Sequence, residues 1–84
     1  MASNNFLHCP CCGFRTLLER AHYEICPVCY WEDDPIQEDN VLYDGGANDI
    51  SLQAARRNFL RLGAMSQEFV GLTRPPTSDE VGND

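Results

Sequence analysis

Two pairs of cysteines constrain what this chain can fold into more than any other feature. Cys9 and Cys12 form one C-x2-C pair, Cys26 and Cys29 form a second, and 13 residues separate the pairs. A tetrahedral metal ion needs four thiolates at about 2.3 Å, and a C-x2-C turn can aim two sulfurs at one point. The spacing therefore predicts one metal site with these four cysteines as ligands.

The residues beside the cysteines suit tight turns around a structural ion. Pro10 and Pro27 fix φ early in each pair, and Gly13 permits a positive φ where the chain leaves the site. We expect Zn²⁺, one ion per chain. Iron is the less favoured metal, although a rubredoxin-like electron-transfer site uses the same C-P-x-C turns.

A closed set of four thiolates argues against catalysis, because a catalytic zinc keeps one position open for water. We therefore expect no enzymatic activity. Cys11, the fifth cysteine, and His8 are candidates for an additional ligand or for a place just outside the ligand set. A thiol redox function stays open as an alternative, because C-P-x-C also resembles the active-site turn of glutaredoxin-like proteins.

Length and hydropathy predict a single small cytoplasmic domain. A chain of 84 residues buries little apolar surface and gains stability from a metal staple. No apolar run approaches the roughly 20 residues of a membrane span, and the first residues lack the pattern of a signal peptide. We expect a domain over 1–76, closed by Arg74-Pro75-Pro76-Thr77, and a mobile acidic polar tail over 77–84.

The local patterns predict a small α+β fold. Residues 14–18 and 23–25 alternate as a β-hairpin, whose core face would carry Phe14, Thr16, Tyr23 and Ile25. A helix is expected over 52–62, with Ser51 as N-cap and Gly63 just past its end. The expected architecture is a zinc-ribbon-like hairpin with two C-P-x-C knuckles, packed against one C-terminal helix through Leu52, Ala55, Phe59 and Leu62.

An acidic segment over 32–49 contains seven carboxylates and no basic residue, within a chain of formal net charge −7 that has no lysine. It is either a solvated loop, a segment paired with Arg56, Arg57 and Arg61, or a binding surface. As a surface it predicts a protein partner that is itself basic, such as a toxin opposed by an immunity or antitoxin protein. The predicted partner-binding residues are Glu32, Asp33, Asp34, Glu38, Asp39 and Asp44.

The same charge disfavours nucleic acid, because affinity for a phosphate backbone rests on Lys and Arg. A nucleic-acid-associated zinc ribbon that acts through Arg56, Arg57 and Arg61 is the remaining alternative. No sequence feature predicts the oligomeric state.

Three stretches resemble the cysteine-rich CPCC family of small bacterial proteins. They are Cys9-Pro10-Cys11-Cys12-Gly13-Phe14-Arg15-Thr16-Leu17, then Tyr23 to Asp34, and Ser51-Leu52 with Ala55-Arg56 and Asn58-Phe59. The resemblance covers about residues 8–76 and implies a stand-alone or appended zinc-ribbon-like domain, without supplying an activity. The chain departs at Ala54, where an acidic residue would close a capping box on Ser51, so a weaker helix start is expected.

Overall fold

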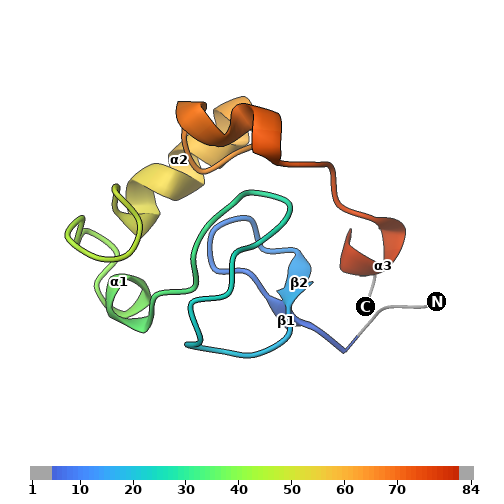
Figure 1. The fold of residues 1–84 in the computed structure, drawn as a ribbon, viewed down its shortest axis with the longest axis horizontal. Coiled ribbons are helices and arrows are strands. Elements are labelled where there is room, and N and C mark those ends of the chain that lie inside the picture. Colours follow the sequence, from blue (N-terminus) through green and yellow to red (C-terminus); the bar gives the residue numbers. More distant parts are fainter. Residues whose placement is uncertain (1–4, 82–84) are drawn as a thin grey trace.

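A two-stranded antiparallel sheet and three short helices surround a cysteine-rich centre in the structure, a computed structural model that describes residues 5–81 (Figure 1). Leu7 pairs with Leu17 across the sheet. The α+β class is as predicted, and the zinc-ribbon assignment stays a prediction. The elements are β1 (Leu7–His8), β2 (Arg15–Leu17), α1 (Pro35–Asp39), α2 (Leu52–Leu62), the 3-10 helix η1 (Gln67–Leu72) and α3 (Ser78–Val81).

The first cysteine turn connects β1 to β2. The Gly13 amide donates to the Cys9 carbonyl over 2.8 Å, and the Cys9 amide donates to the Phe14 carbonyl over 2.8 Å. Gly13 has the positive φ that the sequence predicts, at 83°. The turn thus returns the chain on itself directly after Cys12.

The second cysteine turn repeats this pattern 17 residues later. The Tyr30 amide donates to the Cys26 carbonyl over 2.8 Å, and the Cys26 amide donates to the Trp31 carbonyl over 2.9 Å. Residues 23–25 and 31–33 then run side by side, and an isolated bridge joins Ile25 to Glu32. Each cysteine pair therefore lies at the tip of its own narrow hairpin.

The predicted hairpin of 14–18 with 23–25 is wrong in its pairing. β2 pairs instead with β1, which Leu7 and His8 form before the first cysteine turn. The Glu24 carboxylate accepts hydrogen bonds from the amides of Leu18 and Glu19, which turns the chain away from β2. The two expected core residues of the second strand are largely exposed, Tyr23 at 47% and Ile25 at 45%.

Helix α2 forms over the predicted residues and with the predicted ends. The Ser51 hydroxyl accepts from the Ala54 amide over 3.2 Å, so the N-cap forms without an acidic residue at position 54. Gly63 ends the helix in the left-handed conformation, with φ 75°. Leu52 and Ala55 are buried, and Phe59 packs edge-on against Phe14 with ring centroids 6.3 Å apart.

The C-terminal half is hydrogen-bonded to both cysteine turns. Arg56 Nε donates to the carbonyl of Pro10 over 2.9 Å, across 46 positions of the sequence. The Met65 amide donates to the backbone carbonyl of Cys29 over 2.8 Å, and the Arg74 amide donates to the carbonyl of Pro27 over 3.3 Å. Three separate segments therefore close over the two turns.

The C-terminal end is more ordered than the sequence predicts. Ser78–Val81 form α3, which packs against β2, so the interpretation as a mobile tail is wrong for residues 78–81. The Glu80 side chain is buried and accepts two hydrogen bonds of 2.8 Å from Arg74. Residues 1–4 and 82–84 lie outside the described part of the chain, and the limits of the domain at 76 and 77 stay predictions.

Between α2 and α3, residues 67–72 form the 3-10 helix η1. Trp31 is buried, and Val41 packs against the core. Over residues 5–81, no helix is both long and apolar enough to cross a membrane.

Candidate metal centre

The structure brings the four predicted ligand cysteines together. Their sulfur atoms all lie within 4.8 Å of one another. Cys9 Sγ is 3.6 Å from Cys29 Sγ, and Cys12 Sγ is 3.8 Å from Cys26 Sγ. A tetrahedral site with metal–sulfur bonds of about 2.3 Å has sulfur–sulfur edges of about 3.8 Å. The donor set therefore fits a tetrahedral metal ion.

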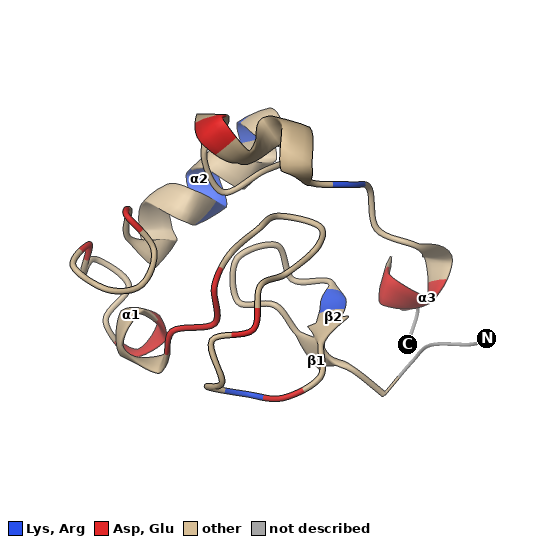
Figure 2. Cartoon of the chain, viewed as in Figure 1, with Lys and Arg blue, Asp and Glu red and all other residues tan. Residues whose placement is uncertain are grey.

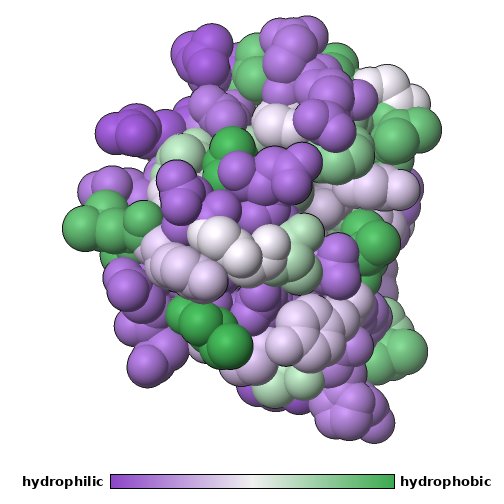
Figure 3. Space-filling view, turned by 60° about the vertical axis from the view of Figure 1, so that its left-hand side comes forward, coloured by the Kyte–Doolittle hydropathy of each residue, from purple (hydrophilic) through white to green (hydrophobic). Residues whose placement is uncertain are grey.

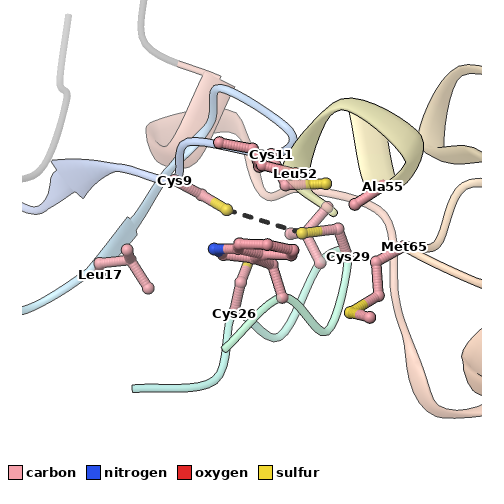
Figure 4. Close-up of a cluster of buried hydrophobic side chains, with 10 residues drawn as sticks. Cys9, Cys11, Leu17, Cys26, Cys29, Leu52, Ala55 and Met65 are labelled. Carbon is pink, nitrogen blue, oxygen red and sulfur yellow. Dashed lines mark hydrogen bonds between the residues drawn. The ribbon is translucent and has the colours of Figure 1, made fainter. Parts of the chain in front are cut away.

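Three of the four sulfurs are closed off from water. Cys26 and Cys29 are 0% exposed, Cys9 is 1% exposed, and Cys12 is partly exposed. The Cys9 and Cys29 sulfurs face one another in Figure 4, inside a shell of apolar side chains. That shell includes Leu17, Leu52, Ala55 and Met65.

Close packing of the thiols perturbs their ionisation in opposite directions. Hydrogen bonds from neighbouring thiols, first from Cys12, hold the pKa of Cys26 far below its usual value. Thiol hydrogen bonds raise the pKa of the other three, chiefly from Cys12 for Cys9, from Cys26 for Cys12 and from Cys11 for Cys29. The cluster thus favours one thiolate and opposes others. A divalent cation would offset this repulsion and let all four cysteines bind as thiolates.

Thr16 contacts the cluster from β2, and sequence reasoning did not single it out as a site residue. Its hydroxyl oxygen lies 3.0 Å from Cys26 Sγ, and Thr16 is buried. The signal in the sequence was its expected place on the core face, since the strand that follows the first pair must pass beside the second pair.

The two candidates for an additional ligand lie differently. Cys11 is buried beside the cluster, but its sulfur is not among the four that lie within 4.8 Å of one another. His8 is exposed, and its Nδ1 lies 2.8 Å from the Gly13 carbonyl, outside the sulfur cluster. Cys11 is therefore a neighbour of the cluster, and His8 is not among the clustered donor atoms but contacts the backbone of the first turn.

Two of the predicted partner-binding carboxylates are buried inside the protein, so they cannot form a docking surface. Asp33 is 0% exposed, and its carboxylate accepts from Arg20 Nη1 over 3.2 Å and from the Ala21 amide over 2.7 Å. Asp34 is also buried; it caps α1 by accepting from the Ile36 amide over 2.8 Å. Both carboxylates hold the backbone in place.

A buried glutamine orders the acidic segment from within. Gln37 is 0% exposed, and its amide nitrogen donates to the carbonyls of Tyr43, Asn48 and Ile50. Its amide oxygen accepts from the Asn48 backbone and side chain. The segment is therefore not a plain solvated loop, although no regular element forms between α1 and α2.

The remaining carboxylates of the acidic segment are either half-buried or exposed on the surface. Glu32 and Glu38 are half-buried, and Glu38 accepts from Trp31 Nε1 over 3.1 Å. Asp39 and Asp44 are exposed, as is Asp49. Acidic residues gather on α1, the loop after it and α3, whereas α2 carries arginines (Figure 2).

Pairing with the α2 arginines was one of three interpretations of the acidic segment, and among residues 5–81 no such ion pair forms. Arg20 instead forms an ion pair with Asp33. Arg56 bonds to the Pro10 carbonyl, and Arg61 donates to the Asn58 side chain over 3.1 Å.

Two matched cysteine turns, closed around four sulfurs and covered by a helix, define a small cysteine-rich α+β protein whose thiols could hold a metal ion. The family comparison makes this more specific. The chain belongs to the cysteine-rich CPCC family, whose model matches residues 7–80. No curated protein matches the chain.

Proposed function

We propose that the chain is a zinc-stapled protein-interaction module and not an enzyme. The observation that carries this proposal is the closed sulfur cluster, with all four atoms within 4.8 Å and three of them buried. Four thiolates in tetrahedral spacing suit zinc and complete its coordination. The matched hydrogen bonds of the two turns support a zinc-ribbon-like arrangement with two C-P-x-C knuckles.

Elemental analysis of the purified chain tests the metal. We expect one zinc per chain, no colour and no cycle of thiol oxidation. One iron with a red chromophore would instead support the rubredoxin-like alternative.

Two cysteine variants test the ligand set. Cys26→Ser is expected to lose the metal and the folded state, because it removes one of the four ligands. Cys11→Ser is expected to keep both, because its sulfur lies outside the four. Equal zinc loss in the two variants would contradict this choice of ligands.

The interaction half of the proposal rests on charge. The formal net charge is −7, and Asp39, Asp44 and Asp49 are exposed on the loop side of the molecule. With this side turned forward, Figure 3 shows a surface that is largely hydrophilic, with separate apolar side chains among the polar ones. We propose that it docks on a basic protein in the cytoplasm, in the concrete form of an immunity or antitoxin protein bound to a basic toxin.

Charge reversal tests the partner surface. We expect the chain to capture a basic protein from its native host, and the double variant Asp39→Lys with Asp44→Lys to lose it. Glu68→Lys is the control, because Glu68 is an exposed carboxylate on η1 and does not belong to the acidic segment 32–49. Equal capture by all three proteins, or capture of acidic proteins alone, would contradict the proposal.

The same preparation tests the nucleic-acid alternative. Because the chain is acidic, we expect no binding to DNA or RNA even at low salt. If the chain binds DNA or RNA and Arg57→Ala abolishes that binding, the nucleic-acid proposal would replace the protein-partner proposal.

A further inference from the structure

The four corners of the sulfur cluster are chemically unequal. Cys9, Cys26 and Cys29 are buried, whereas Cys12 is partly exposed. Cys26 also has a hydroxyl group within hydrogen-bond distance, from Thr16 at 3.0 Å. Exposure and hydrogen bonding both govern the reactivity of a thiolate, so the corners should react at different rates.

The Thr16 hydroxyl group contacts the Cys26 sulfur. A cysteine that binds a metal carries no proton on sulfur, so the Thr16 hydroxyl must be the donor in their contact. A hydrogen bond donated to sulfur draws electron density away from the lone pairs that would attack an electrophile. Since both residues are buried, no water competes for that bond.

Cys12 has neither form of protection. Its sulfur lies 3.8 Å from Cys26 Sγ, a contact between two prospective ligands, and within residues 5–81 no hydroxyl group is hydrogen-bonded to it as Thr16 is to Cys26. Gly13 follows it on the surface, and a side-chain carbon added there would meet nothing within 4 Å. Cys12 is therefore the most accessible of the four cluster cysteines, and the residue beside it is exposed.

We propose that Cys12 is the corner at which soft electrophiles modify the cluster, while Thr16 keeps Cys26 intact. This inference rests on the proposed zinc site. The electrophiles that fit are small and uncharged, such as α,β-unsaturated carbonyl compounds, because the net charge of −7 repels anions.

The step needs no oxidant. The Cys12 thiolate attacks the β-carbon, and a sulfur–carbon bond forms. The electron pair of the carbon–carbon double bond moves to the α-carbon, which takes a proton from water. The product sulfur is a neutral thioether and a weaker ligand, so the metal site opens at this corner and zinc is released.

The test treats the zinc-loaded chain with one equivalent of N-ethylmaleimide, maps the adducts by peptide mass spectrometry and follows zinc with a coloured chelator. Cys11→Ser protein is treated in parallel, because the fifth thiol would otherwise compete for the reagent. In both proteins we expect about tenfold more adduct on Cys12 than on Cys26, with zinc release in step. First adducts on Cys9, Cys26 or Cys29 would overturn the proposal.

Two Thr16 variants separate a chemical role from a structural one. Thr16→Val removes the hydroxyl group at nearly constant volume and should raise the Cys26 adduct several-fold, whereas Thr16→Ser should behave as wild type. Circular dichroism of each variant checks that α2 is intact. Equal Cys26 labelling in all three zinc-loaded proteins would overturn the role of Thr16 and leave the zinc site standing. A wild-type chain that holds no zinc would overturn the proposed function itself.

Discussion

Gly13 and Tyr30 occupy the same position in the two cysteine turns, and both have a positive φ, 83° and 76°. Glycine adopts this conformation freely, whereas a tyrosine is strained in it. The Tyr30 ring stacks on Phe69 of η1, with centroids 4.6 Å apart and planes inclined by 28°. The first turn thus forms because glycine adopts a positive φ without strain, whereas the second turn is held by a contact with a distant part of the chain.

Gly13→Ala tests the first turn. The added carbon meets no atom within 4 Å, so the cost comes from the left-handed backbone alone. We expect a loss of about 1 kcal/mol in the free energy of unfolding of the zinc-loaded protein, measured by denaturant titration. Gly71→Ala is the control, because Gly71 has equal space and no positive φ. A Gly13→Ala protein as stable as the control would contradict the argument.

Gln37→Leu tests the order of the acidic segment. The change leaves the carbonyls of Tyr43, Asn48 and Ile50 without their donor inside the protein. We expect the free energy of unfolding to fall by about 3 kcal/mol. Gln53→Leu, on the exposed face of α2, should be close to neutral. Similar denaturation midpoints for the two variants would show that the glutamine does not hold the segment.

Glu38 predicts a dependence of stability on pH. Burial, together with a hydrogen bond to Asp33, raises the pKa of Glu38 from 4.5 to about 7. The folded state then binds the proton more tightly than the unfolded state, so this group's contribution to stability falls as pH rises from about 4.5 to about 7.

Glu38→Gln should remove that pH-dependent contribution, because glutamine does not titrate. The amide oxygen of the variant can still accept from Trp31 Nε1, so this hydrogen bond is kept. Thermal unfolding of both proteins between about pH 5 and pH 8 measures the difference. We expect the thermal stability of the variant to increase relative to that of the wild type as pH rises. Parallel curves would mean that Glu38 keeps its ordinary pKa.

The Arg74–Glu80 pair predicts how α3 responds to acid. Hydrogen bonds from Arg74 lower the pKa of Glu80, so the stabilisation is present above the usual carboxyl pKa and is lost as pH falls. Glu80→Gln should loosen α3 at neutral pH and speed hydrogen exchange of the Glu80 and Val81 amides about tenfold. Glu68→Gln is the matched control. Unchanged exchange in Glu80→Gln would show that the pair does not anchor α3.

The features that could be predicted from the sequence are those with local causes. Helix α2 begins at a hydroxyl cap and ends at a left-handed glycine, and both signals lie within a few residues of the ends they determine. The cysteine cluster was predictable for a similar reason, because each pair is placed by its own tight turn. Each turn brings its own two sulfurs together, and the packing of the two hairpins then brings the pairs to one point.

The features that were missed depend on contacts between distant residues. Alternation in residues 23–25 indicated a strand but not its pairing partner. That partner depends on the carboxylates of Glu24 and Asp33, which accept hydrogen bonds from backbone amides in residues 18–21. Asp34 and Gln37 look like loop residues in the sequence. They are buried because their side chains replace the hydrogen bonds that an irregular backbone would otherwise take from water.

The three hydrogen bonds from Arg56, Met65 and Arg74 to the cysteine turns imply an order of assembly. Each of them ends on a carbonyl of a cysteine turn, at Pro10, Cys29 or Pro27, so we expect these bonds to form after the turns have closed. Capture of the metal would then be the nucleating event, and docking of the helix would follow it. We accordingly expect a newly made chain to reach its native state faster when it meets the metal ion than without it.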